Sequence, residues 1–306
     1  MTRRAWWLWV GQGVLALLLA VFVWRAVARN WDAFRALEID LRVDPLFVAL
    51  AAACVLLTYA LLIEAWRRVL AGWGERLPFG AAAKIWCVSN LGRYVPGKIW
   101  SIAGLAVLAR RAGVSGWSAA GSAVAMQALA VGTGTAVAAL ALPGALSLGQ
   151  GVAALLVAMA AVGLLTWDRM TRSVAAVIAP QSGLRALSPA TAVAAAVITL
   201  ASWCAYGLAF WLLARGLLPG PWPGLRTAVG VFAAGYLVGL LALFAPGGVG
   251  VRELMFVGLL APTMGSGAAL ALTLGSRLLL TATEVGAALG TMWLARSLGP
   301  LKEDAV

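Results

Sequence analysis

Long apolar runs dominate the sequence, and most polar and charged residues gather in the short segments between them. Six runs approach or exceed the roughly 20 residues that a helix needs to cross a hydrocarbon core of about 30 Å. They are Trp6–Ala28, Pro45–Ile63, Trp117–Leu142, Gly149–Thr166, Pro189–Ala214 and Gly267–Ala295. The pattern predicts an all-α, polytopic integral membrane protein. The first run is longer than the apolar part of a signal peptide, so we expect an uncleaved span there.

Two further apolar segments are each interrupted by a Pro-Gly pair. The first consists of Phe79–Leu91, GRYVPGK and Ile99–Leu108, and the second of Leu225–Phe244, APGGVGVRE and Leu254–Ala261. Proline removes a backbone donor and glycine permits a tight reversal, so a helix stops at each pair. The two pieces of the first segment reach only roughly 20 and 15 Å, too short to cross. We expect two re-entrant segments, with eight crossing spans as the alternative.

The two breaks divide the chain into similar halves. Pro96 and Pro246 are 150 residues apart, and each half contains two spans, a broken segment and a final span. We expect a single transmembrane domain, 1–306, built from pseudo-repeats at about 1–143 and 147–306. If neither break crosses, each half crosses three times, and the second half must then run opposite to the first. That is the inverted-repeat architecture common in secondary transporters.

The basic residues outside the breaks favour one orientation. With the N-terminus inside, the inside segments hold thirteen of them: Arg3, Arg4, Arg67, Arg68, Arg76, Lys84, Arg110, Arg111, Arg169, Arg172, Arg185, Arg296 and Lys302. The outside segments hold six: Arg25, Arg29, Arg35, Arg42, Arg215 and Arg226. This bias predicts a multi-pass protein of the cell inner membrane with both termini cytoplasmic. Both the six-span and the eight-span arrangements give these termini.

Composition agrees with this class and narrows the chemistry. Hydrophobic residues make up 63% of the chain and charged residues 11%, against about 25% charged in soluble domains. Because loop residues account for the net charge of +12, no nucleic-acid partner is expected. The chain has no histidine and only three scattered cysteines. We therefore expect no metal, no cofactor and no disulfide framework.

Ionisable residues and Pro-Gly breaks at membrane depth indicate a polar site. The first break contributes Asn90, Arg93, Pro96, Gly97 and Lys98, the second Pro246, Gly247, Gly248, Arg252 and Glu253, and the last span Arg277 and Glu284. Ionisable groups at such depth usually face the protein interior or a wet cavity. A break also frees amide groups at the start of the next half-helix, where anions bind. We predict that Arg93, Lys98 and Arg252 converge on the phosphate of a phospholipid or a polyprenyl-phosphate.

A structural role for the same charges is the alternative. Arg252 and Glu253 would then pair with charges on neighbouring helices and only hold the fold. Arg277 and Glu284 are seven residues apart on one helix face, too distant to pair with each other, so each needs another partner. These two are candidates either for a buried structural charge or for proton coupling.

Two further patterns predict packing rather than chemistry. Gly235–Gly239 and Gly286–Gly290 have the small-xxx-small spacing of closely packed membrane helices. Several tryptophans lie near proposed span ends, as in an interfacial aromatic belt. They are Trp6, Trp7, Trp9, Trp31, Trp66 and Trp117.

The segments NLGRYVPGKIW and APGGVGVRE resemble the lysylphosphatidylglycerol synthase transmembrane-region family, a flippase-like family of inner-membrane proteins. The resemblance falls on Asn90, Gly92, Arg93, Pro96, Gly97 and Lys98, and on Pro246, Gly247, Gly248, Gly250, Arg252 and Glu253. It implies a role in moving or handling lipid-linked molecules. The sequence stops at Val306, so neither the soluble aminoacyltransferase domain of the full-length synthase nor lysyl transfer is expected.

The leading hypothesis is a flippase-like or scramblase-like transporter of an anionic phospholipid or a polyprenyl-phosphate-linked lipid, with membrane lipids as its partners. One alternative is a membrane enzyme acting on a polyprenyl-linked substrate, and another is a non-catalytic partner of a lipid or glycan synthase. The lack of a paired-carboxylate or nucleophile motif argues against the enzyme. No GxxxxGK[ST] motif is present, so we do not expect nucleotide to drive transport directly.

Overall fold

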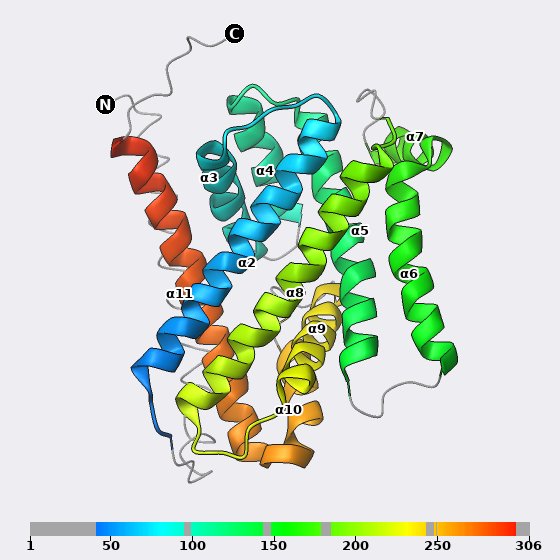
Figure 1. The fold of residues 1–306 in the computed structure, drawn as a ribbon. Helices are drawn as coiled ribbons and strands as arrows, with labels where there is room; N and C mark the ends of the chain where they lie inside the picture. The colour runs from blue at the N-terminus through cyan, green and yellow to red at the C-terminus, as the bar shows by residue number, and fades with distance from the viewer. Residues whose placement is uncertain are drawn as a thin grey trace.

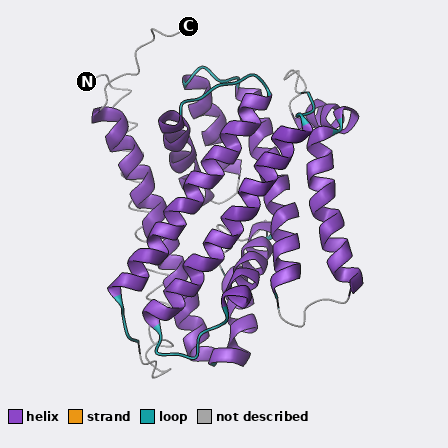
Figure 2. Cartoon of the chain, in the orientation of Figure 1, coloured by secondary structure: helices purple, strands orange, loops and turns teal. Residues whose placement is uncertain are grey.

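The computed structural model describes residues 41–94, 99–142, 148–178, 185–242, 248 and 250–297. This part of the chain is helical and contains no strand, which confirms the all-α class (Figures 1 and 2). Its helices are α2 (Pro45–Gly72), α3 (Phe79–Asn90), the 3-10 helix η1 (Leu91–Tyr94), α4 (Ile99–Arg111), α5 (Gly116–Ala141), α6 (Leu148–Thr166), α7 (Asp168–Ile178), α8 (Pro189–Leu217), α9 (Leu225–Leu241), α10 (Val251–Met264) and α11 (Ser266–Ser297). The predicted first span, Trp6–Ala28, lies outside the described residues.

Five of the described helices, α2, α5, α6, α8 and α11, are long and apolar enough to cross a membrane. They correspond to the predicted spans from Pro45 onwards, although α2 continues beyond the predicted end to Gly72. The extension is stabilised by Glu64, whose carboxylate accepts hydrogen bonds from Arg67 at 2.5 Å and Arg68 at 3.0 Å, one helical turn away. The five long apolar helices confirm the multi-pass membrane class.

The helices α2 and α8 pack antiparallel along their lengths. Each begins with proline at its first position, behind a side-chain cap from Asp44 or Ser188. Near the end of α8, a Cβ added to Gly216 would lie 3.0 Å from Cβ of Phe47, close to the start of α2. At the opposite end, a Cβ on Gly72 would lie 2.6 Å from Leu187, just before α8. Contacts at both ends fix the opposite directions of the two helices.

Two short helical hairpins, α3–α4 and α9–α10, enter the bundle from opposite ends (Figure 1). Their helices have 12, 13, 17 and 14 residues, which correspond to roughly 18 to 26 Å. The predicted segment Leu225–Phe244 was long enough to cross, but α9 ends at Leu241 because Ala242 leaves the helical region with ψ 80°. These lengths and directions favour re-entrant hairpins over the eight-span alternative.

Both hairpins reach the middle of the bundle. The ring of Tyr236, near the end of α9, lies 5.4 Å from the ring of Trp203 at the midpoint of α8. The end of the first hairpin meets α11 at Glu284. The neighbouring Thr283 lies 3.1 Å from the hydroxyl of Tyr59, midway along α2. The described ends of both hairpins next to the breaks thus lie near the middle of the bundle.

Close helix packing occurs at one of the two predicted glycine pairs. A Cβ on Gly235 would lie 2.3 Å from the Phe256 ring, and Gly239 lies against Gly248 and Arg252, which confirms the first pair. At Gly286 and Gly290 an added Cβ would meet no described atom within 4 Å. Close packing of this second pair therefore stays a prediction.

The aromatic-belt prediction was wrong for Trp66 and agrees with the position of Trp117. Trp66 is fully buried and its indole N–H donates to Oγ of Ser122 at 2.7 Å, because this face of α2 packs against α5. Trp117 is 43% exposed at the start of α5, as an interfacial tryptophan would be.

The glycine packing yields a matched pair of substitutions. Gly235→Ala places a methyl group 2.3 Å from the Phe256 ring, so we expect the free energy of unfolding to fall by about 1–3 kcal/mol. Gly286→Ala adds a methyl group where no described atom lies within 4 Å, and it should leave stability unchanged or raise it by up to about 1 kcal/mol. Thermal unfolding of the purified proteins in detergent checks both, and equal effects would contradict the packing described.

The opposite entry of the hairpins predicts opposite accessibility of their outer ends. Arg76 lies in the exposed loop before α3, and Gly224 is exposed directly before α9. In a background without cysteine, Arg76→Cys and Gly224→Cys should react with a membrane-impermeant thiol reagent from opposite sides of intact vesicles. Reaction of both from the same side would overturn the opposite entry of the two hairpins.

Candidate functional site

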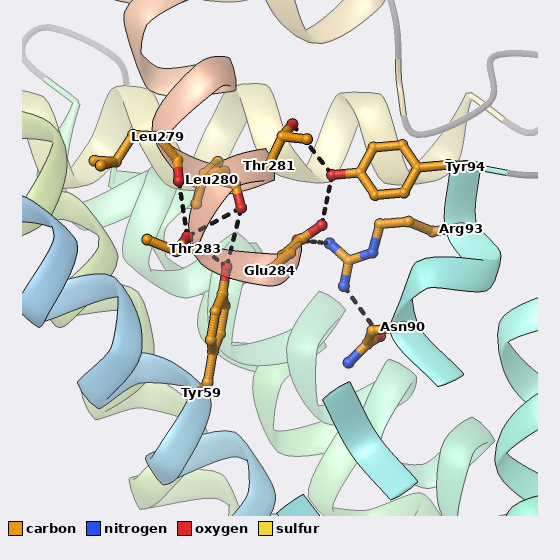
Figure 3. A network of polar contacts seen from close by, with 9 residues as sticks. All are labelled: Tyr59, Asn90, Arg93, Tyr94, Leu279, Leu280, Thr281, Thr283 and Glu284. Carbon is orange, nitrogen blue, oxygen red and sulfur yellow. Dashed lines mark hydrogen bonds and ion pairs between the residues drawn. The ribbon is translucent and has the colours of Figure 1, made fainter. Parts of the chain in front are cut away.

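The 3-10 helix η1, between α3 and α4 of the first hairpin, binds a buried carboxylate on α11 through two hydrogen bonds. Nη1 of Arg93 donates to Oε1 of Glu284 at 2.7 Å, and the hydroxyl of Tyr94 donates to its Oε2 at 2.5 Å (Figure 3). Nη2 of Arg93 donates to Oδ1 of Asn90 at 3.0 Å. Glu284 is only 7% exposed, and a buried carboxylate requires such a partner. This contact joins residues from the two halves of the chain.

The sequence around η1 explains how Arg93 and Tyr94 reach α11. The tighter 3-10 turn continues α3 by four residues, and it packs closely on the start of α4. A Cβ on Gly92 would lie 2.8 Å from the backbone nitrogen of Ser101, so any larger residue would push η1 away from α4. Glycine at this motif position therefore closes the hairpin and aims the next two side chains at Glu284.

Hydroxyl groups extend the contact along α11. Tyr94 also approaches Oγ1 of Thr281 at 3.3 Å. Next to Glu284 on the same helix, Thr283 lies with its Oγ1 3.1 Å from the hydroxyl of Tyr59, which is also 3.4 Å from the carbonyl oxygen of Leu280 (Figure 3). These bonds tie α2, the first hairpin and α11 into one polar network.

In the second hairpin the charges of the contact with α11 are reversed, because the hairpin contributes the carboxylate and α11 contributes the arginine. Glu253, in the first turn of α10, accepts from the amide of Gly250 at 2.6 Å and from Nη1 of Arg277 at 2.5 Å. Gly248 and Gly250 have φ of 71° and 84°, which favours glycine at both positions. A Cβ on Gly248 would also lie 2.9 Å from Cα of Gly239, so this turn lies directly on α9.

Arg252 lies beside this pair in a different environment. Its guanidinium carbon is 5.6 Å from the centre of the Phe256 ring, and its Nε is 3.7 Å from Oε1 of Glu253. The Nε atom is buried and has no hydrogen-bond partner among the described residues. Glu284 and Tyr236 interact electrostatically with both Arg252 and Arg93. Arginines and carboxylates from both hairpins and from α11 thus form one group, named the polar centre below. It consists of Arg93, Arg252, Glu253, Arg277 and Glu284.

The structure brings together several of the predicted site residues. Glu284 and Arg277 each have the separate partner that their spacing required, Arg93 and Glu253 respectively. Pro96, Gly97, Lys98, Pro246 and Gly247 lie outside the described residues. The convergence of Arg93, Lys98 and Arg252 on a phosphate thus stays a prediction. Among the described residues, no three His, Cys, Asp or Glu side chains gather to hold a metal ion.

Sequence analysis missed the hydroxyl partners of Glu284 and α11. Tyr59 and Thr281 lie within apolar runs, where a single hydroxyl gives no signal of its role. Tyr94 stands inside the GRYVPGK segment, directly after Arg93. Its place in the first break was therefore the one signal that was available.

Comparison with known proteins identifies the family. The family model described as the lysylphosphatidylglycerol synthase TM region matches residues 8–285, a range that includes both breaks and every charged residue of the polar centre. A search of curated proteins finds no match.

The contact between Arg93 and Glu284 predicts energetic coupling between two residues far apart in sequence. In a double-mutant cycle of Arg93→Gln and Glu284→Gln, we expect a coupling energy of about 1–3 kcal/mol, because either single change leaves a partly buried charge unpaired. The matched cycle of Arg93→Gln with Glu253→Gln should give a coupling near zero, since Glu253 pairs with Arg277. Unfolding in detergent measures both cycles, and equal coupling in the two would contradict the pairing.

Proposed function

We propose that this chain, which belongs to the lysylphosphatidylglycerol synthase transmembrane-region family, moves an anionic lipid across the cell inner membrane as a flippase or scramblase. The substrate class is an anionic phospholipid or a polyprenyl-phosphate-linked lipid. One observation carries the proposal: two short hairpins enter the bundle from opposite ends (Figure 1), and each forms a buried ion pair with α11. Arg93 of the first hairpin bonds to Glu284 (Figure 3), and Glu253 of the second hairpin bonds to Arg277.

The arrangement of the helices supports alternating access. Two pairs of elements run in opposite directions (Figure 1). One pair is the long helices α2 and α8, and the other is the hairpins α3–α4 and α9–α10. We therefore take 1–143 and 147–306 as inverted repeats of one transmembrane domain, 1–306. In transporters with such repeats the site at the midplane opens first to one side and then to the other.

The chemistry of the centre suits a phosphate headgroup. A headgroup that crosses the apolar core loses its hydration, so it needs fixed donors and opposite charge on the way. Arginine offers a planar set of donors that matches phosphate oxygens. In the proposed site, Asn90, Arg93, Gly248 and Arg252 act with Pro96, Gly97, Lys98, Pro246 and Gly247. Glu253, Arg277 and Glu284 hold the charges in place, and Glu284 is the candidate for proton coupling.

The distribution of charge supports cytoplasmic termini. The C-terminal ends of α2 and α6 lie at the same end of the bundle, because Trp73 contacts Arg185 and Leu165 contacts Leu187. The described basic residues near this end are Arg67, Arg68, Arg76, Arg110, Arg111, Arg169, Arg172 and Arg185. The opposite end has Arg42, Arg215 and Arg226. We assign the arginine-rich end, and with it both termini, to the cytoplasm.

Lipid movement in reconstituted vesicles tests the function. We expect the protein to move fluorescent phosphatidylglycerol between the two leaflets. Chemical quenching of the label in the outer leaflet measures this movement. Arg93→Gln should lower the initial rate at least about tenfold, because a charged donor is lost. Arg93→Lys should give an intermediate rate, since it keeps the charge but loses the planar fork.

Arg226→Gln is the matched control. Arg226 is exposed at the end of the bundle and its side chain bonds to the carbonyl oxygen of Leu140, away from the polar centre, so its rate should equal that of the unchanged protein. If the unchanged protein moves neither phosphatidylglycerol nor a labelled polyprenyl-phosphate, the transport proposal is wrong. A stoichiometric synthase that copurifies with such an inactive protein would favour the partner-subunit alternative.

A further inference from the structure

Arg252 differs from the other arginines of the polar centre in how its charge is compensated. Arg93 donates to Glu284 at 2.7 Å and to Asn90 at 3.0 Å, and Arg277 donates to Glu253 at 2.5 Å. Arg252 is 8% exposed, yet its buried Nε has no hydrogen-bond partner in the described part of the chain. The carboxylate nearest to it, that of Glu253, lies 3.7 Å away and already accepts from Arg277 and Gly250.

Such a side chain is unfavourable for the fold alone. Burying a charged donor without a hydrogen bond costs the full loss of its hydration. The ring of Phe256, at 5.6 Å from the guanidinium carbon, offsets only part of that loss. Buried charges that are kept without a protein partner commonly serve a ligand instead.

The surroundings of Arg252 favour an anion. Arg252 is the second residue of α10, a helix of 14 residues, and the first turn of such a helix presents amide groups and the positive end of the helix dipole. Gly248 and Gly250 form the turn that leads into it. At Gly239 a side chain would lie 3.1 Å from Cβ of Arg252, so the absence of one lets α9 approach the start of this helix.

We infer that Arg252, together with the first turn of α10, is the primary contact of the phosphate group of the ligand, because Arg93 is bonded to Glu284 in this arrangement. This assignment rests on the proposed function and names the phosphate-binding residue within that site. The recognised chemistry is a phosphate group with at least one negative charge, carried by a lipid headgroup or by a water-soluble phosphate ester.

Stability measurements separate a ligand role from a structural one. Arg252→Met removes the charged group whose Nε has no hydrogen bond among the described residues, and it keeps most of the side-chain volume. We expect the full-length variant in detergent to unfold at the same temperature as the unchanged protein or a few degrees higher, because a buried cation is lost. A structural ion pair or cation–π contact would instead lower the unfolding temperature, and this result would overturn the assignment.

Binding measurements then test the phosphate directly. Short-chain phosphatidylglycerol should raise the unfolding temperature of the unchanged protein in a concentration-dependent way. Arg252→Met should weaken this binding at least about tenfold, with Arg252→Lys in between. Arg226→Gln, at the outer end of the bundle, should bind like the unchanged protein.

Two comparisons identify the source of the phosphate and separate this assignment from the transport proposal. Stabilisation by short-chain phosphatidylglycerol but not by glycerol 3-phosphate supports a lipid ligand, and the reverse supports a soluble ester. Equal binding of phosphatidylglycerol by Arg252→Met and the unchanged protein, or no stabilisation of the unchanged protein by either probe, overturns the assignment. If Arg252→Met loses binding and the unchanged protein moves no lipid in vesicles, the phosphate assignment is supported and the transport proposal is wrong.

Discussion

Two ion pairs on α11 hold the ends of the two interrupted segments near the middle of the bundle. Broken backbone and ionised side chains survive inside a bilayer only where protein or water covers them. Glu284 of α11 pairs with Arg93 at the end of the first hairpin, and Arg277 of α11 pairs with Glu253 at the start of α10. Because these two residues are seven positions apart, about two helical turns, one face of α11 serves both hairpins. The same helix thereby fixes how deeply each of them enters.

Small residues make this arrangement sterically possible. Gly92 lets η1 lie against α4, and Gly235 and Gly239 let α10 and its preceding turn lie against α9. Membrane helices gain little from hydrophobic burial against each other, so close packing and polar contacts supply much of their association. The hairpins combine both: glycine contacts bring the backbones together, and the charged contacts to α11 set their depth.

The balance of charges gives the polar centre its chemical character. Arg93 and Arg277 are each bonded to a carboxylate, whereas Arg252 has only a distant one and a buried Nε without a partner in the described residues. Arg252 also interacts electrostatically with Glu284 of α11, the residue that Arg93 of the first hairpin contacts.

The sequence by itself determined the class of the protein, the number of long helices from α2 onwards and the positions of the two breaks. These features depend on local hydropathy, proline and glycine, which act over a few residues. The sequence also required Arg277 and Glu284 to have separate partners, but only the tertiary structure selected Glu253 and Arg93, the latter 191 residues from Glu284. The same holds for Tyr59 beside Thr283 and for the buried Trp66. Apart from the contact indicated by the spacing of Gly235 and Gly239, which helix faces meet depends on packing between segments distant in the chain, and local patterns do not encode it.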